Sequence, residues 1–167
     1  MLVTLDVLKS KGACEDGIKY FKSLEKQEWE ICELMERCFK DKRQDYARWL
    51  FKCVETIEEL GKAIDLTIKK REYLHWAFKD CNKVFEKDLE LFKKAVEFHI
   101  KKRWSLGFAF RHCNKAFEND LELFKKAVEL YIKKGLHLDD ALKCYPTLFE
   151  NDPALHKKAL EYQKRFF

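Results

Sequence analysis

Apolar residues in the middle of the chain recur with the period of a helix. Leu74, Ala77, Phe78, Cys81 and Phe85 fall at i, i+3, i+4, i+7 and i+11, with mostly polar residues between them. In an α-helix of about 3.6 residues per turn, these positions share one face. The pattern predicts an amphipathic helix over 74–85, called helix A, with this face toward a core.

A second helix, called helix B, is predicted to follow helix A. Thr56 with Glu59 matches a capping box, and Gly135 is expected to end a later copy as its C-cap. Aspartates stand at the predicted N-cap of three copies: Asp88, Asp120 and Asp152. Helix A and helix B together predict a helical hairpin.

The hairpin pattern repeats along the chain with an offset of 32 residues. Residues 81–102 and 113–134 are identical at 18 of 22 positions. Weaker copies extend the pattern to five repeats: roughly 10–41, 42–73, 74–105, 106–137 and 138–167. Because one hairpin cannot bury its own apolar face, stacked neighbours must cover it. We therefore expect an all-α fold, an α-solenoid or curved bundle of about five 32-residue hairpins, forming a single domain over 1–167.

One position breaks the repeat. Ala13, Ala77, Ala109 and Ala141 correspond, and alanine suits a close helix crossing, but the second repeat has Asp45 there. An unpaired carboxylate at a packed site would be costly. We interpret Asp45 as the N-cap of a helix that starts later; a functional acid is the alternative.

Composition agrees with a helical protein and changes the functional picture little. The chain has 167 residues, 47% hydrophobic, two prolines and five glycines, and its 34 basic residues face 29 acidic ones for a net charge of +5. This mixed surface is not that of a dedicated nucleic-acid binder. The start lacks signal-peptide features, and no apolar run approaches the ~18 residues of a membrane helix. We expect no membrane segment and a cytoplasmic location, or the host cytoplasm for a viral protein.

No motif indicates catalysis, a metal or a cofactor. The seven cysteines form no CxxC pair and are expected to be buried free thiols in a reducing compartment. His112 and Cys113 are neighbours that point about 100° apart on a helix, so they cannot form a dyad directly. Cys81 and Cys113 are equivalent core positions, and the histidines lack metal-binding spacing. We expect no catalytic residues, no metal site and no cofactor, and therefore a protein that is not an enzyme.

Two basic rows are predicted on the surface. On helix B, lysines recur once per repeat at Lys62, Lys94, Lys126 and Lys158, and glutamates precede the first three by four residues. This order favours a self-neutralised, solvated face. On helix A, the side opposite the core carries aromatic and basic residues: Trp76, Lys79, Lys83, Phe108, Arg111, Lys115 and Lys143.

The helix A row is the predicted binding face. Its like charges at i, i+4 repel instead of cancelling, and aromatic residues with arginine are typical of interaction hot spots. Trp104, which follows Arg103 in a turn between repeats, is a further candidate of this kind. The alternative is that Trp76 and Phe108 pack against the adjacent repeat.

Two segments near the N-terminus carry a resemblance. GACEDGIKYF (12–21), followed by DYARWLFKC (45–53), resembles the opening of small bacterial and phage proteins of unknown function. The resemblance covers about a quarter of the chain. It implies a prokaryotic or viral source and no activity.

Three functional hypotheses follow. The favoured one is a non-catalytic interaction protein whose helix A face binds an acidic protein surface, for example as a phage or bacterial inhibitor or adaptor. In the second, the same face binds single-stranded nucleic acid, with aromatic rings stacking on bases and cations meeting phosphates. The third is a small enzyme with its site at Asp45. The oligomeric state is left open.

Overall fold

The computed structural model describes residues 2–102 and 104–166, most of which are helical, so the predicted all-α class is confirmed at that level. The chain divides into two compact units, Met1–Val84 and Phe85–Phe167, called the first and the second unit. The expected single repeat domain over 1–167 stays a prediction. None of the helices in the described residues combines the length and apolarity that crossing a membrane requires.

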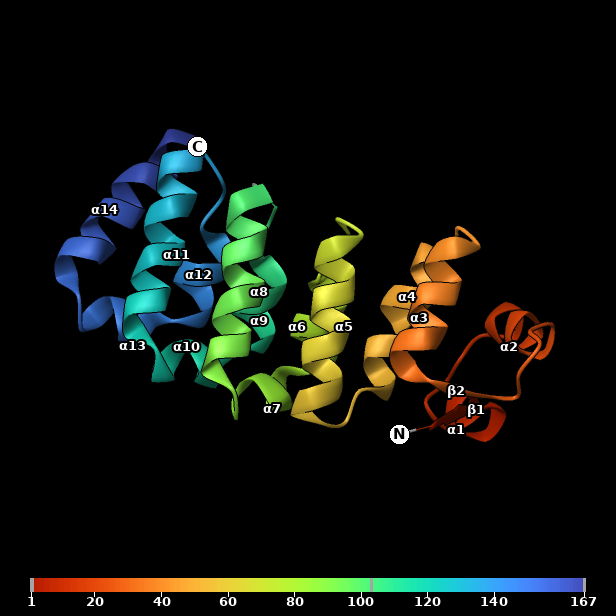
Figure 1. Cartoon of the computed structure of the whole chain (residues 1–167). Helices are drawn as coiled ribbons and strands as arrows, with labels where there is room; N and C mark the ends of the chain where they lie inside the picture. The colour runs from red at the N-terminus through yellow and green to blue at the C-terminus, as the bar shows by residue number, and fades with distance from the viewer. Residues whose placement is uncertain (1, 103, 167) are drawn as a thin grey trace. The chain divides into compact units, whose positions relative to one another are not determined.

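The first unit contains helices of one to four turns and one pair of strands (Figure 1). Its elements in chain order are β1 (Leu2–Thr4), α1 (Leu5–Ser10), α2 (Glu15–Lys22), β2 (Glu28–Glu30), α3 (Ile31–Lys40), α4 (Gln44–Trp49), the 3₁₀ helix η1 (Leu50–Cys53), α5 (Ile57–Lys69), α6 (His75–Asp80) and the start of α7 (Asn82–Phe85). Helix α3 packs against both α4 and α5.

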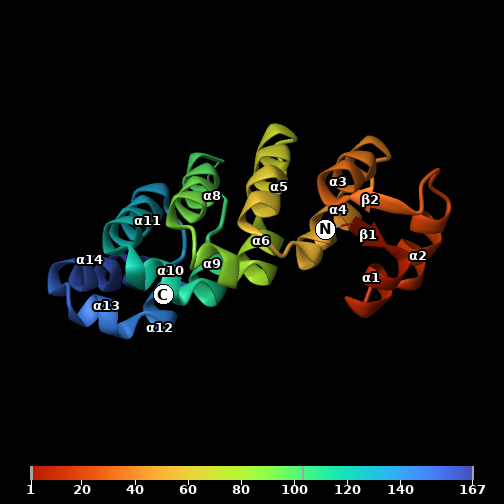
Figure 2. The same ribbon diagram turned by 60° about the horizontal axis from the view of Figure 1, so that its bottom comes forward.

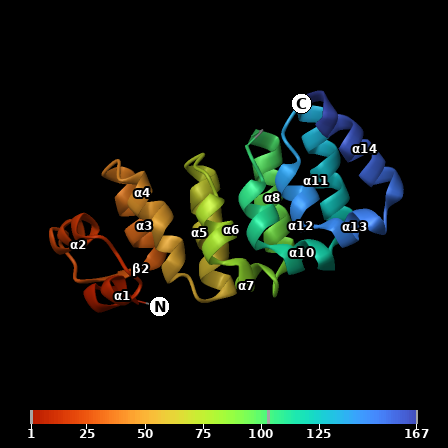
Figure 3. The ribbon, with the colours of Figure 1, turned by 180° about the vertical axis from the view of Figure 1, so that it is seen from behind.

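The strand pair was not predicted from the sequence. β1 and β2 are antiparallel, with Val3 opposite Trp29, and they lie between α1 and α3 (Figure 3). Val3 and Trp29 are buried, whereas Leu2, Glu28 and Glu30 are exposed. Each strand is only three residues long, too short for its alternation to stand out from a helical pattern.

The second unit is wholly helical among its described residues. Its elements are α8 (Leu89–Lys102), α9 (Gly107–His112), α10 (Asn114–Asn119), α11 (Leu121–Lys134), α12 (Asp139–Cys144), α13 (Pro146–Glu150), α14 (Pro153–Gln163) and the 3₁₀ helix η2 (Lys164–Phe166). The long helices α8, α11 and α14 pack in sequence, and α9 packs against α12, so long and short helices form two layers (Figure 2). Phe167, the end of the expected fifth repeat, lies outside the described residues.

The prediction of a continuous helix A is wrong in one respect. In each of the last three repeats, this segment is two short helices separated at one residue: Cys81, Cys113 or Tyr145. At Cys113 the backbone has φ −112° and ψ 42°, outside the helical region. Yet its N–H donates to Ala109 O at 2.9 Å, and its carbonyl accepts from Phe117 N at 3.2 Å. The helical register therefore survives the break, and the predicted apolar face stays buried.

The predicted caps are confirmed. The side chains of three aspartates accept backbone N–H groups three residues later at 2.9–3.0 Å: Asp88, Asp120 and Asp152. Thr56 and Glu59 form the predicted capping box at the start of α5. Gly135 ends α11 with φ 71°, a left-handed conformation that favours glycine.

One repeat position carries buried polar side chains that sequence reasoning missed. The residues at this position are Thr67, His99, Tyr131 and Gln163. In the second unit, the hydroxyl of Tyr131 accepts a hydrogen bond from Leu106 N, and Gln163 Oε1 accepts one from Leu138 N at 3.1 Å. Leu106 and Leu138 are the N-caps of α9 and α12 and have no cap of their own. Helix B therefore satisfies a buried N–H at the start of helix A in the same repeat.

The Asp45 interpretation is wrong in detail. Asp45 lies inside the first turn of α4, whose N-cap is Arg43, and its side chain is 91% exposed and paired with Arg48 at 3.1 Å. Ala47 takes the fully buried place. The repeat period is thus shifted by two residues here, which keeps the carboxylate in water. At the regular positions Ala77, Ala109 and Ala141, no side-chain area is exposed, as predicted.

Candidate functional site

A partly open apolar cavity of about 280 Å³ lies within the first unit. Its walls come from α1, α2, α3, α4, η1 and α6 and include Leu8, Ala13, Phe21, Leu34, Trp49, Leu50 and Trp76. Both segments that carry the N-terminal resemblance contribute lining residues. The cavity therefore gathers positions that are far apart in the sequence.

The turn between α1 and α2 forms one edge of the cavity. Gly12 has φ 78° and reverses the chain after α1, where a residue with a Cβ would be strained. Cys14 then caps α2, with its Sγ accepting the N–H of Gly17 at 3.4 Å. This geometry places Ala13 and Cys14 on the lining.

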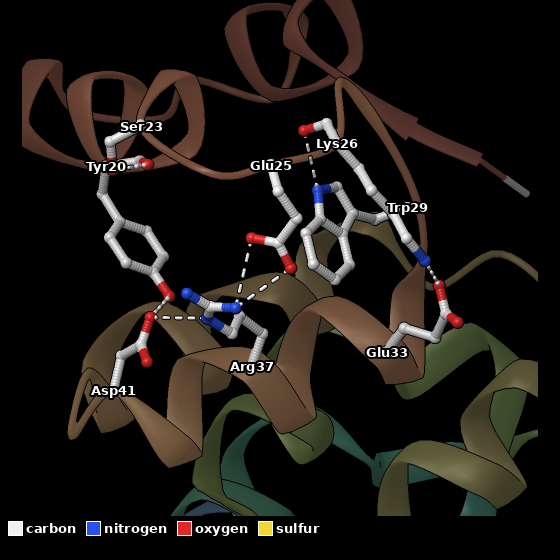
Figure 4. A network of polar contacts seen from close by, with 8 residues as sticks. All are labelled: Tyr20, Ser23, Glu25, Lys26, Trp29, Glu33, Arg37 and Asp41. Carbon is white, nitrogen blue, oxygen red and sulfur yellow. Dashed lines mark hydrogen bonds and ion pairs between the residues drawn. The ribbon is translucent and has the colours of Figure 1, made fainter.

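A polar network fixes the wall formed by Tyr20 (Figure 4). The Tyr20 hydroxyl donates to Asp41 at 2.9 Å, and Arg37 Nε donates to the same carboxylate oxygen at 2.8 Å. Arg37 Nη1 also donates to both oxygens of Glu25, at 3.0 and 3.1 Å. The network ties α2 and the following loop to α3, so that the ring of Tyr20 is held against the cavity.

Electrostatics keep this network in one protonation state at neutral pH. Hydrogen bonds from Arg37 and then from Tyr20 hold the pKa of Asp41 below its ordinary value. Burial and the hydrogen bond to Asp41 raise the pKa of Tyr20. Tyr20 therefore stays protonated and Asp41 ionised, which is the pairing that the hydrogen bond requires.

A second contact group anchors the strand β2 beside this network (Figure 4). Trp29 Nε1 donates to the carbonyl of Lys26 at 3.1 Å, and the Lys26 ammonium lies 4.9 Å from the Trp29 ring centroid. The same ammonium pairs with Glu33 on α3 at 3.3 Å. Trp29 is buried, so this group is part of the scaffold that supports the cavity.

Cations stack on four aromatic rings that line the cavity. Arg43 lies 5.9 Å from the Tyr20 centroid and 5.7 Å from that of Tyr46. The two remaining pairs are Lys52 over Trp49 at 5.6 Å and Lys79 over Trp76 at 5.2 Å. Among the described residues, no ion pair joins Arg43, Lys52 or Lys79 to an acid. Positive charge thus surrounds an apolar cavity without local neutralisation.

The cysteines of this region differ in their chemistry. Burial raises the pKa of Cys38, on the cavity lining, to about 11, and that of the nearby Cys53 to about 11. These thiols stay neutral and unreactive at physiological pH. Cys81 and Cys113 are buried core residues, as predicted, and burial raises the pKa of Cys81. Cys14 is exposed at the cavity edge.

Three predicted binding residues lie in the first unit. Trp76 is half-buried on the cavity lining, so its ring is neither fully exposed nor fully packed. Lys79 is exposed and stacked on that ring, and Lys83 is exposed. The structure therefore brings Trp76 and Lys79 together at the cavity.

The prediction that the helix A charges are not cancelled is wrong in the second unit. Arg111 stacks on Phe108 at 5.4 Å, but Arg111 Nε also pairs with Asp140 Oδ1 at 3.0 Å. Lys115 pairs with Glu86 at 3.9 Å. These acids lie in neighbouring repeats, which a search for partners within one helix does not reach.

Two further candidates differ from each other. Trp104 is half-buried and packs edge-on against Phe98 and His99, at centroid distances of 5.4 and 5.5 Å, so it is part of the packing after α8. Its neighbour Arg103 lies outside the described residues. Lys143 on α12 is exposed.

The helix B lysine row is neutralised, but not only in the predicted way. Lys62 pairs with Glu58 at i, i+4 as predicted. In the second unit Lys126 pairs with Glu97, and Lys158 with Glu129 at 3.1 Å, both on the preceding helix B. The interpretation of this row as a solvated face is unchanged, because each of these lysines has an acidic partner.

The described residues contain no cluster of His, Cys, Asp and Glu that could hold a metal ion. Comparisons with protein-family models, with curated proteins and with solved structures find no match to this chain. The resemblance of the N-terminal segments to small bacterial and phage proteins stays a prediction.

Proposed function

We propose that this chain is a non-catalytic interaction protein that binds an acidic segment of another protein through the first unit. The observation that carries the proposal is the set of cations stacked on the cavity rings: Arg43, Lys52 and Lys79. Cations held on aromatic faces beside an apolar cavity suit a partner with carboxylates next to apolar groups. Trp76 and Lys79, chosen from the sequence, belong to this surface.

The lining favours a protein over single-stranded nucleic acid. A base inserted into the cavity would bury polar edge atoms, which is costly without hydrogen-bond partners. The Tyr20 hydroxyl is already bonded to Asp41, and Leu8, Phe21, Leu34 and their neighbours offer none. In the second unit, the Arg111 and Lys115 charges are already paired with acids.

We also propose that the 32-residue hairpins stack as an α-solenoid. The support comes from the second unit, where α8, α11 and α14 pack in order and α9 packs against α12. The side chain at one repeat position binds the start of helix A in both complete repeats of this unit. Such nearest-neighbour packing is what a repeat array requires.

A peptide selection tests the proposed function. The full chain would be immobilised and used to select 12-residue peptides from a random display library, and their affinities measured by fluorescence anisotropy. We expect acidic sequences, whose affinity falls at least about tenfold with Lys79→Glu because a stacked cation is reversed. Lys133→Glu, at an exposed position in the second unit, is the matched control and should leave the affinity unchanged.

Two results would overturn the proposal. The first is a selection that returns neutral or basic peptides, or peptides that bind Lys79→Glu equally well. The second is tight, steeply salt-dependent binding of single-stranded DNA or RNA that Lys79→Glu abolishes, which would favour the nucleic-acid hypothesis. The expected inhibitor or adaptor role, phage or bacterial source and cytoplasmic location remain predictions from the sequence.

A further inference from the structure

We infer that the cavity of the first unit is an anchor pocket that takes one large apolar side chain from the acidic partner segment. This inference rests on the proposed function and makes it more specific. It assigns the cavity to the anchor and the stacked cations to carboxylates that flank the anchor in the peptide.

The size of the cavity fits a single anchor. Its volume is about 280 Å³. An engineered protein cavity of about 150 Å³ holds a benzene molecule. The pocket is therefore large enough for one Trp, Phe or Leu side chain and too small for an entire folded element. Binding energy at protein interfaces concentrates in such buried aromatic or aliphatic anchors.

The walls select for an apolar occupant. Phe21 and Leu34 on the lining are apolar and buried in the core. The polar atoms at the lining are already engaged, since Cys14 Sγ accepts from Gly17 N and the Tyr20 hydroxyl donates to Asp41. A polar side chain entering here would leave water without gaining hydrogen bonds, which is unfavourable.

The charges around the pocket select for acidic flanks. The cationic groups of Arg43, Lys52 and Lys79 lie 5.2–5.9 Å from the centroids of lining rings, so they are close to any chain entering the pocket. Asp45, which also contributes to the lining, is paired with Arg48 and adds no free negative charge. Carboxylates next to the anchor therefore meet cations that have no acidic partner among the described residues.

The pocket also has a fixed shape before the partner arrives. The Tyr20 wall is held by Asp41 and Arg37, and the turn at Gly12 by its backbone conformation. A preorganised pocket spends less binding energy on ordering its own side chains. This is the feature that distinguishes an anchor pocket from a surface depression.

The test uses the acidic peptides selected on the full chain and changes the anchor and the pocket separately. On the peptide, each large apolar residue is replaced by Ala; on the protein, Ala13→Leu fills the cavity with a larger lining side chain. Ala154→Leu, the same change at an exposed position of α14, is the matched control. We expect one apolar residue of each peptide, and Ala13→Leu, to cost at least about tenfold in affinity, and Ala154→Leu to cost nothing.

The outcomes separate this inference from the proposed function. Loss of binding with Lys79→Glu but not with Ala13→Leu or any peptide alanine would overturn the anchor pocket and retain the acidic partner. Equal affinity for all of these variants would overturn both. Should Ala13→Leu fail to fold by circular dichroism, the alanine series on the peptides still decides, because it leaves the protein unchanged.

A small apolar acid is the competing occupant. Dodecanoate would be titrated against the full chain while the fluorescence of Trp49 and Trp76 on the lining is followed. Saturable dodecanoate binding that Ala13→Leu abolishes, together with peptides that lack an apolar anchor, would overturn the peptide assignment. Displacement of dodecanoate by a selected peptide would support it, since both would then need the same cavity.

Discussion

The two units use aromatic residues in opposite ways. In the second unit, the rings of Phe110, Phe117, Phe124, Tyr145 and Phe149 contact one another at centroid distances of 5.0–6.1 Å and are all buried. In the first unit, four rings instead surround a cavity of about 280 Å³ and carry cations. Regular repeats fill their core with one another's side chains, whereas the diverged repeats leave space for something else.

The charges follow the same division. In the second unit, four basic residues pair with acids 29 residues away: Arg111 with Asp140, Lys115 with Glu86, Lys126 with Glu97 and Lys158 with Glu129. An offset of 29 is one helical turn short of the 32-residue period, so each pair bridges equivalent helices of neighbouring repeats. The cations at the cavity of the first unit lack such partners among the described residues. Divergence has released them for binding.

The largest expected effect comes from importing the deviation of the first unit into the second. Ala109 has no exposed area, and Ala109→Asp would place a carboxylate where nothing can pair with it. We expect a loss of about 3–5 kcal/mol in the free energy of unfolding, measured by urea titration with circular dichroism.

The matched control reverses the change in the first unit. Asp45 is exposed, so Asp45→Ala removes only a surface ion pair with Arg48 and should change the stability by less than about 1 kcal/mol. A large effect of Asp45→Ala would mean that the carboxylate has a role beyond solvation at a shifted repeat position.

A smaller effect is expected from the buried polar position of the second unit. Tyr131→Phe keeps the ring but leaves the buried N–H of Leu106 without its acceptor. We expect a loss of about 1–3 kcal/mol in the same unfolding experiment. Tyr46→Phe in the first unit removes a hydroxyl with no hydrogen bond among the described residues and should change the stability by less than about 0.5 kcal/mol. Equal effects would show that the Tyr131 hydroxyl does not support the hairpin.

Much of the helical framework could be predicted from local sequence because its causes are local. Caps such as Asp120 and Gly135 act within one turn, and the buried alanines recur at a fixed offset. The break at Cys113 could not be predicted, because the helical hydrogen-bond register continues through it and the apolar spacing is the same with or without it. The shift to Ala47 was missed since the period was held at 32 throughout.

The candidate site was only partly predictable. Trp76 and Lys79 were found because an aromatic and a cation stand three residues apart on a polar face. The cavity itself is a space left between helices, and residue types alone do not specify an unfilled volume. The partner of Arg111 could have been found by searching for acids one turn away from the repeat offset, where Asp140 lies.

The hydrogen-bond network behind the cavity predicts an acid sensitivity specific to the first unit. Arg37 and Tyr20 hold the pKa of Asp41 below its ordinary value, so the unfolded chain binds this proton more readily than the folded one. The stabilisation is complete above the unfolded pKa of about 3.9 and is lost as the pH falls through the lower folded value. Tyr20→Phe should cost about 1 kcal/mol at pH 7.

The measurement compares wild type and Asp41→Asn in urea at several pH values, followed by tryptophan fluorescence. Three of the four tryptophans lie in the first unit: Trp29, Trp49 and Trp76. The stability difference between the two proteins should shrink as the pH is lowered below about 4. Asp16→Asn, at an exposed position, is the control and should show no such convergence. A difference that is constant with pH would contradict the proposed charge pairing.

The smallest effect concerns the ion pairs between repeats. Lys158 and Glu129 are both about half exposed, so their pairing should contribute only about 0.2–1 kcal/mol. A double-mutant cycle with Glu129→Gln and Lys158→Met measures this coupling directly. It should disappear in 1 M salt, where charges are screened within about 3 Å. The i, i+4 pair Glu58–Lys62 of the first unit is the reference, because it lies within one helix and does not depend on the stacking of repeats. If the inter-repeat coupling is zero while the reference pair is measurable, the basic residues of the second unit are not held by their acids, and the contrast in charge between the units would have to rest on the cavity alone.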